Sequence, residues 1–174
     1  MSHFYLPGPW PKPGQDFTDE VVLDAKLAHH LRVRRYQLNE TFKVFDGKGF
    51  SANACLTVMD KKSAAVRLSE IQENLRSETK VPITLAQGIA GGDKMDWLIE
   101  KAVELGIHHI IPLHTERSVV RLDGERALKK QTHWEGILIA ASEQSGRTVL
   151  PSIEPVQNIP LWLSSLNPHD NALR

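Results

Sequence analysis

One run near the middle of the chain, DKMDWLIEKAVELGIHHIIPLHTERS at residues 93–118, predicts a helix, a glycine stop, a buried strand and a polar loop. Apolar residues recur at helical spacing between residues 95 and 103, so one face of the helix is expected to pack. Asp93 is expected to cap this helix, and Gly106 to end it in a left-handed conformation. The apolar residues 107–113 have the length of a strand. Because open α/β sheets place their chemistry at the carboxyl ends of strands, the loop at residues 115–118 is a candidate site.

The hydrophobic pattern of the chain changes near residue 75. Before that point, short alternating segments are separated by tight turns, which is typical of a small β-barrel. These predicted strands cover residues 41–46, 50–58 and 64–71. We expect a helix at 24–35 beside the barrel, and an irregular extended arm at 1–15 because prolines recur there. The first domain is therefore predicted to cover residues 1–74.

The second predicted domain, residues 75–174, has the longer periods of an α/β fold. A strand at 83–90 precedes the helix and strand described above, and the three elements form one βαβ unit. A long helix is expected at 125–145, and a short one at 159–166 with Pro160 in its first turn. The buried stripe of the long helix is predicted to contain Leu128, Ile137, Leu138 and Ala141.

Composition excludes several classes of site. The 174 residues carry 21 basic (Lys and Arg) and 21 acidic side chains, so net charge does not indicate a nucleic-acid partner. A single cysteine, Cys55, excludes an intrachain disulfide and a cysteine zinc site. His108, His109 and His114 lack the spacing of metal ligands, so no metal is expected, and one of the first two is expected in the core. Without a secretory or spanning segment, the protein is expected to be cytoplasmic, with no membrane partner.

Two pairs of opposite charges occur at helical spacing, and each allows two interpretations. Glu143 and Arg147 form either a surface salt bridge at a helix end or a carboxylate–guanidinium pair that positions a loop or binds phosphate. Lys101 and Glu104 form either a solvated pair three residues apart or part of a site. Residue types and spacing alone leave both questions open.

A third charged cluster falls at the end of the first predicted helix, and we call it the basic patch. It consists of His30, Arg32, Arg34 and Arg35. Cations at this end of a helix interact favourably with the helix dipole, which would explain them without any ligand. Several basic side chains on one surface also suit the phosphates of a nucleic acid. Both explanations remain open on these residues alone.

Taken in order, five motifs resemble those of the RsmE-type bacterial 16S ribosomal RNA (uracil-N3)-methyltransferases of the SPOUT class. The motifs are HHLRVRR, VFDGKGF, LAQGIAGGDKMDWLIEKAVELGI, IIPLHTERSVV and AASEQSGR. The resemblance implies a PUA-like RNA-binding β-barrel followed by an α/β domain that ends in a trefoil knot. It also implies S-adenosylmethionine as cofactor, N3 of one uridine in 16S rRNA of the small ribosomal subunit as the methylated atom, and a homodimer.

The same resemblance implies roles for particular residues. Arg117 and Arg147 would contact an anion, Glu143 would hold that architecture with Gln144, and Glu104 would be a proton acceptor; these four ionisable residues form the expected catalytic set. The RNA-binding residues would be His30, Arg32, Arg34, Arg35 and Lys101.

The chain departs from the family pattern in its first domain and at its end. Asn39 stands where a glycine is usual in a turn, and asparagine tolerates the left-handed conformation required there. The family's G-P-E-G-G loop and later L-G-x-R-I-L-R segment, which form the knot and most of the cofactor pocket, are expected after Arg174. Only the first half of the α/β domain is then present, and the cofactor-binding residues are expected beyond this chain. The alternative to an active enzyme is an inactive truncated remnant that binds RNA and dimerises.

Overall fold

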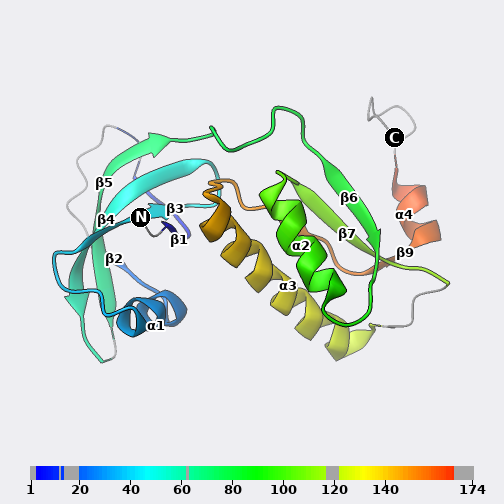
Figure 1. Ribbon diagram of the computed structural model, residues 1–174, viewed down its shortest axis with the longest axis horizontal. Helices are drawn as coiled ribbons and strands as arrows, with labels where there is room; N and C mark the ends of the chain where they lie inside the picture. The colour runs from blue at the N-terminus through cyan, green and yellow to red at the C-terminus, as the bar shows by residue number, and fades with distance from the viewer. Residues whose placement is uncertain (1–2, 12, 14–19, 62, 117–121, 167–174) are drawn as a thin grey trace. The chain divides into compact units, whose positions relative to one another are not determined.

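The computed structural model describes residues 3–11, 13, 20–61, 63–116 and 122–166, and it divides into two compact units (Figure 1). The first unit contains Met1–Glu78 and Ser142–Leu150, and the second contains Thr79–Ala141 and Pro151–Arg174. The predicted boundary after residue 74 falls close to the first junction. The return of residues 142–150 to the first unit has no signal in the local sequence pattern, because only long-range contacts define it.

A five-stranded sheet with one helix against it forms the first unit. The sheet has the order β1-β3-β4-β5-β2, and β3, β4 and β5 are antiparallel neighbours. The strands are β1 (His3–Tyr5), β2 (Val21–Val22), β3 (Thr41–Phe45), β4 (Phe50–Met59) and β5 (Ala64–Glu73). The three strands predicted at 41–71 are therefore present.

The N-terminal arm differs from its prediction. Residues 3–5 form a strand parallel to β3, with Tyr5 opposite Phe45. This pairing arises because the edge of β3 offers unpaired backbone groups to an extended segment. Phe4 is 2% exposed and joins the core. The prediction of an irregular arm is thus wrong for these three residues.

One hydrophobic core unites the sheet with helix α1 (Ala25–Val33). Asp24 begins the helix, and its carboxylate accepts the N–H of Leu27 at 2.7 Å. Leu27 and Leu31 are buried on the inner face of α1. The strands contribute Phe42, Val44, Ala54, Leu56, Val66 and Leu68 to the same core.

Two turns of the first unit have the geometry that the sequence predicts. Asn39 is left-handed, with a φ of 68°, as expected for an asparagine in place of a glycine. In the hairpin between β3 and β4, the Asp46 carboxylate accepts the N–H groups of Lys48 at 2.7 Å and Phe50 at 3.0 Å, and Gly47 has a φ of 80°. Local sequence therefore fixes both turns.

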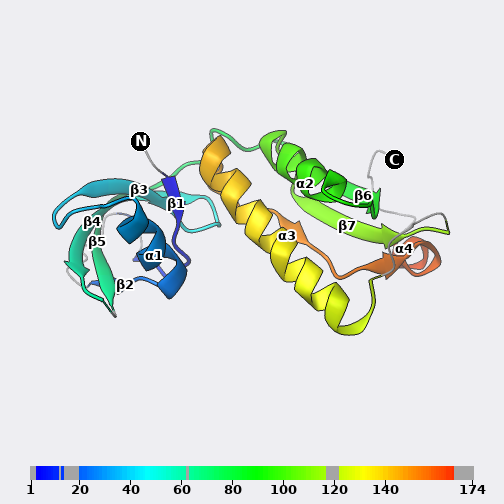
Figure 2. The same ribbon diagram turned by 60° about the horizontal axis from the view of Figure 1, so that its bottom comes forward.

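The second unit is a parallel sheet with two long helices on one face (Figures 1 and 2). Its elements are β6 (Thr84–Gly88), α2 (Lys94–Glu104), β7 (His109–His114), α3 (Gly124–Ser145), β8 (Ser152–Ile153), β9 (Gln157–Asn158) and α4 (Ile159–Ser165). Strand β7 lies between β6 and β8, and its last residues also pair with β9. Right-handed crossovers then put α2 and α3 on the same face. The sequence does not predict β8 or β9, because two residues cannot show a period.

Helix α2 confirms the predicted buried stripe but not the predicted cap. Met95, Ile99 and Val103 are fully buried, and Gly106 follows the helix with a φ of 92°. Asp93, in contrast, is itself helical (φ −80°, ψ −1°) and its side chain makes no capping hydrogen bond. The expected Asp93 cap is therefore wrong.

Two further core predictions for the second unit are wrong. Leu138 and Ala141 of the stripe predicted on α3 are buried, but Leu128 is 66% exposed, and the large buried side chain of that helix is Trp134. His108 precedes β7 and is half-buried, whereas His109 is exposed and its Nδ1 lies 2.7 Å from the Ser152 hydroxyl. Neither histidine is in the core, because both rings have polar partners: Nδ1 of His108 accepts the backbone N–H of Ile83 at 3.3 Å, and the His109 ring meets the Ser152 hydroxyl and solvent.

Candidate functional site

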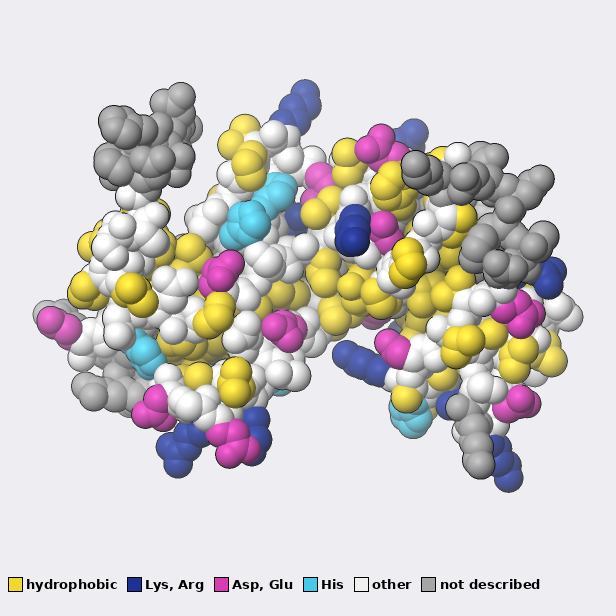
Figure 3. Space-filling view, turned by 180° about the vertical axis from the view of Figure 1, so that it is seen from behind, with side chains coloured by type: hydrophobic (Ala, Val, Ile, Leu, Met, Phe, Trp, Pro, Cys, Tyr) yellow, Lys and Arg dark blue, Asp and Glu magenta, His cyan; other side chains and the backbone are white. Residues whose placement is uncertain are grey.

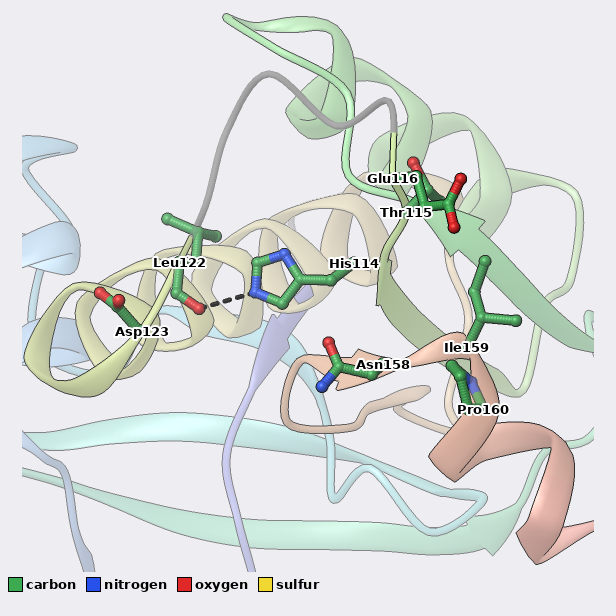
Figure 4. A pocket seen from close by; sticks show the side chains of 8 residues that line it. All are labelled: His114, Thr115, Glu116, Leu122, Asp123, Asn158, Ile159 and Pro160. Atoms are coloured by element: carbon green, nitrogen blue, oxygen red, sulfur yellow. Dashed lines mark hydrogen bonds between the residues drawn. The ribbon is translucent and has the colours of Figure 1, made fainter.

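The carboxyl edge of the second sheet holds a pocket, shown in Figure 4. Its volume of about 810 Å³ lies within the range of roughly 300–1,000 Å³ typical of small-molecule sites. The lining comes from the end of β7, the residues before α3 and the start of α4: His114, Thr115, Glu116, Leu122, Asp123, Asn158, Ile159 and Pro160. This is the edge at which the sequence predicts a functional loop.

Strand register places two polar side chains of the pocket side by side. In the parallel pairing of β9 with β7, His114 lies opposite Asn158. Residues opposite each other in a sheet project from the same face. At the end of β6, Gly88 lies close to Thr115, the residue that follows β7. A Cβ added at Gly88 would lie only 3.0 Å from the Thr115 methyl carbon, so glycine leaves the space that Thr115 needs. The pocket is therefore built by the sheet and not by one loop alone.

A backbone hydrogen bond orients His114. Its Nε2 lies 2.8 Å from the carbonyl oxygen of Leu122 (Figure 4). Because a carbonyl only accepts, Nε2 must carry a proton, and in the neutral ring Nδ1 keeps a lone pair. The carboxylates of Glu116 and Asp123 line the same pocket. The pocket is thus rich in hydrogen-bond acceptors, a property that sequence reasoning missed.

Arg117, predicted to contact an anion at this edge, lies outside the described residues. Its neighbour Glu116 is described and is exposed at the pocket. The catalytic role expected for Arg117 stays a prediction.

Lys101 and Glu104 form the solvated pair that one interpretation predicted. The Lys101 ammonium donates to Glu104 at 2.8 Å and to Glu100 at 2.9 Å. These hydrogen bonds, first the one to Glu104, raise the pKa of Lys101 above its ordinary value. Because α2 runs back from the carboxyl edge of β6 to the amino edge of β7, its last turn lies at the edge opposite the pocket. The structure does not bring this pair together with the pocket, and its RNA-binding and catalytic roles stay predictions.

Glu143 lies in the first unit and binds a backbone group far away in sequence. Its carboxylate accepts the N–H of Tyr5 at 3.0 Å, so the end of α3 is tied to β1. Gln144, next to it, is exposed. The expectation that Glu143 holds the surrounding architecture is compatible with this contact, and its place in the catalytic set stays a prediction.

Arg147 is the centre of a buried cluster that we call the clasp, formed by Glu78, Arg147, Thr148 and Val149. Arg147 is 1% exposed and donates to one Glu78 oxygen through Nε at 3.1 Å and through Nη2 at 2.6 Å. The other Glu78 oxygen accepts the N–H groups of Thr148 and Val149, each at 3.2 Å. Sequence reasoning missed Glu78, because it lies 69 residues before Arg147. The surface salt bridge considered for Arg147 is wrong, and its anion-binding role stays a prediction.

Within the basic patch, Arg32 and Arg35 differ in what they contact. Arg32 donates to the carbonyl oxygen of Asp60 at 2.5 and 3.2 Å, which ties α1 to the turn between β4 and β5. Arg35 has a φ of 60° and is exposed. Arg32 is therefore engaged with the backbone, whereas Arg35 presents its side chain to solvent.

The other two members of the basic patch gather around one aromatic ring. The His30 ring meets the edge of Phe4 with centroids 5.2 Å apart, and the Arg34 guanidinium lies 5.7 Å from the same centroid. Elsewhere, on the face seen in Figure 3, Lys and Arg side chains are scattered among acidic and apolar ones. The patch is thus a local concentration of basic groups on a protein without net charge.

A polar cluster that sequence reasoning missed joins α2 to α3. Asp96 accepts hydrogen bonds from Lys130 at 2.9 Å and from the Trp134 indole at 3.1 Å, and its other oxygen lies 2.7 Å from His133 Nε2. Burial raises the pKa of Asp96, but the hydrogen bonds, first that from Lys130, outweigh burial and hold the pKa below its ordinary value. The cluster fixes the helix layer that covers the sheet.

Two kinds of feature are absent from the part of the chain that the structure describes. No group of three or more His, Cys, Asp or Glu side chains there is arranged to hold a metal ion. None of the described helices is both long and apolar enough to cross a membrane.

Two protein families match this chain. The RNA methyltransferase domain matches residues 77–173, and the RNA methyltransferase PUA domain matches residues 23–69. The two matches agree with the two-part fold predicted from sequence, a PUA-like barrel followed by an α/β domain.

Individual relatives give the same result. The chain is 32% identical over 152 residues to ribosomal RNA small subunit methyltransferase E of Bacillus subtilis, covering 87% of this chain and 59% of that protein. It is 36% identical over 153 residues to the protein of that name from Aquifex aeolicus, covering 85% and 61%. A crystal structure of ribosomal RNA small subunit methyltransferase E from Neisseria gonorrhoeae, bound to S-adenosylmethionine, superposes with a TM-score of 0.87 at 39% identity, covering 97% and 67%. The chain thus spans about three fifths of the length of the first two relatives.

Proposed function

Because the chain belongs to the RsmE-type RNA methyltransferases of the SPOUT class, we propose that the protein methylates N3 of one uridine in 16S ribosomal RNA. The methyl donor in this proposal is S-adenosylmethionine. One observation carries it: a PUA domain at 23–69 and a methyltransferase domain at 77–173 occur in this order in one chain. The first offers a surface for RNA, and the second offers a pocket at the carboxyl edge of a parallel sheet.

The RNA contact is assigned to the basic patch and Lys101. Within the patch, Arg34 and Arg35 are exposed, and a loop of RNA backbone can neutralise their charge. Arg32 contributes indirectly, because its hydrogen bond to Asp60 holds the end of α1 in place. Such contacts position the RNA and do not read its sequence.

The chemistry requires an acceptor near the uracil ring. N3 of uridine carries a proton that must leave before the nitrogen can attack a methyl group. The base must also leave its stack to reach a pocket. The acceptor-rich lining, with Glu116 and Asp123, suits a base whose reacting edge presents an N–H group. Positioning and stabilisation of the resulting anion then supply most of the catalysis.

The described residues do not make a complete site for S-adenosylmethionine. Among the described residues, the lining of the pocket contains two carboxylates but no Lys or Arg to receive the carboxylate of the methionyl group. The neighbour from Neisseria gonorrhoeae, bound to S-adenosylmethionine, continues beyond the part that this chain matches. We therefore assign the cofactor to residues outside those described here.

The assembly and location follow the family. We assign the protein to a homodimer that acts on the small ribosomal subunit in the cytoplasm. The alternative function is an RNA-binding and dimerisation module without activity, which would rest on the PUA domain match at residues 23–69.

The test is methyl transfer to small ribosomal subunits that lack the modification, with S-adenosylmethionine labelled in its methyl group. We expect incorporation of one methyl group per subunit and a primer-extension stop at one uridine, because an N3 methyl group blocks base pairing. Binding of the subunits without incorporation would establish the inactive alternative. Failure to bind them would contradict both functions.

A further inference from the structure

We propose that His114 removes the N3 proton of the target uridine. This inference rests on the proposed uridine methylation and names the group that makes N3 nucleophilic. The resemblance offers only Glu104 for this task, and Glu104 ends α2 at the edge of the sheet opposite the pocket. His114 ends β7 and lines the pocket itself.

The hydrogen bond to Leu122 decides which nitrogen acts. At 2.8 Å from the Leu122 carbonyl, Nε2 is the donor, so the neutral imidazole keeps its lone pair on Nδ1. A base whose second nitrogen is fixed by a backbone carbonyl holds one tautomer and one orientation, which is what general-base catalysis requires. Figure 4 shows Nδ1 on the side of the ring away from Leu122.

Polar groups line the pocket beside His114. Among the described residues, the lining includes the carboxylates of Glu116 and Asp123. Asn158 is the cross-strand neighbour of His114 and lines the same pocket.

The proton transfer balances without any further reactant. The N3–H bond of uridine breaks, and its electron pair stays on the uracil ring. A bond forms between that proton and Nδ1, and the imidazole becomes an imidazolium that still donates from Nε2 to Leu122. The uridine anion is then the nucleophile that methylation needs, and the proton later passes from Nδ1 to water.

The first experiment does not depend on methyl transfer. Nitrogen-15 spectra of the His114 ring in the full chain are recorded with millimolar uridine and with millimolar 3-methyluridine. Uridine should shift the Nδ1 resonance, because its N3–H donates to that nitrogen, and 3-methyluridine should not, because it has no N3 proton. No shift with uridine, an equal shift with both nucleosides, or a proton on Nδ1 and none on Nε2 in the neutral ring would overturn the inference.

The second experiment uses the methyl-transfer assay of the proposed function. His114→Gln keeps a donor for Leu122 but has no basic nitrogen, so the rate at neutral pH should fall by about 100-fold or more. The loss should shrink as pH rises, because hydroxide replaces the missing base, and added imidazole should restore part of the rate. The matched control is His109→Gln, at the other end of β7, which should leave the rate unchanged.

The outcomes separate this inference from the proposed function. If the wild-type protein, with its cofactor-binding residues, transfers no methyl group, the proposed function fails, and the nucleoside spectra alone decide whether His114 accepts a proton from N3. If the wild type is active and the His114→Gln variant has the same rate and the same pH profile as the wild type, His114 is not the base. A loss of rate that neither pH nor imidazole changes would show a structural role and would also overturn the inference.

Discussion

Two pairs of opposite charges occupy opposite environments in the structure. Lys101 and Glu104 form a hydrogen-bonded pair on the solvent face of α2, with side chains 39% and 28% exposed. Arg147 and Glu78 form a pair whose side chains are only 2% and 7% exposed. The first pair is local, and the second joins residues 69 positions apart. Spacing in the sequence therefore identifies the weaker pair and misses the stronger one.

The difference has a physical origin in desolvation. An exposed pair gains little, because water solvates both charges nearly as well when they are apart. In a buried pair, removal of one partner leaves a charge that water cannot reach, so the loss is large. Glu78 also accepts two backbone N–H groups of the clasp, which would lose their partner as well.

The largest effect is expected at the clasp. Glu78→Gln keeps the shape of the side chain but removes its charge, so the free energy of unfolding should fall by about 3–5 kcal/mol. Urea unfolding followed by circular dichroism measures this change. Glu104→Gln, the same substitution in the exposed pair, is the control. Equal midpoints for the two variants would break the comparison on which this account is built.

Asp96 is the intermediate case, with a side chain 24% exposed. Asp96→Asn keeps an acceptor for Lys130 and Trp134 but loses the charge, so a loss of about 1 kcal/mol is expected. The pKa of this carboxyl is held below its ordinary value of 3.8, so its stabilisation is present above pH 3.8 and lost as pH falls through the lower folded value. The difference between wild type and variant should therefore shrink in acid. A difference that persists in acid would show that charge is not its source.

The basic patch allows a similar comparison for RNA binding, between an exposed arginine and one that is hydrogen-bonded to the backbone. Arg35→Ala removes an exposed charge, so RNA affinity should fall several-fold and the slope of log K against log salt should become shallower by about one phosphate contact. Arg32→Ala, whose guanidinium is engaged by Asp60, should change the slope less. Filter binding of 16S rRNA fragments at several salt concentrations measures both slopes. Identical slopes for wild type and Arg35→Ala would remove Arg35 from the RNA surface.

The smallest effect is expected at the exposed pair. Lys101→Met removes an ammonium that holds Glu104 and Glu100 in solvent, so the urea midpoint should not move measurably. If that variant unfolds as easily as Glu78→Gln, burial does not decide the strength of these pairs.

Local signals predicted the parts of the fold that short-range physics determines. The tight turn at Asp46 and the left-handed Asn39 each depend on residues within four positions of one another, and so does the Asp24 cap of α1, which was not predicted. The buried face of α2 followed from its 3.6-residue period. Strands β1, β8 and β9 escaped prediction, because pairing with a distant strand makes them regular and two or three residues carry no period.

The features of the candidate site also fall into those that local sequence predicts and those that depend on distant residues. Its location at the end of β7 follows from a general rule for α/β sheets, and sequence predicted it. The partners of Asp96 and Arg147 lie at least 34 residues away, so no spacing rule could supply them. The orientation of His114 depends on a backbone carbonyl oxygen. Every residue has such a group, so the sequence cannot show which one binds the ring.

On the proposed function, the reacting uridine meets the carboxyl edge of the second sheet and neither of the two charged pairs. A small-subunit RNA with 4-thiouridine at the methylated position can be photocrosslinked to the protein, and the crosslinked peptides identified by mass spectrometry. We predict crosslinks to the residues that line the pocket, which are 114–116, 122–123 and 158–160. Crosslinks confined to α2 around Lys101 and Glu104, or to the clasp, would contradict the account.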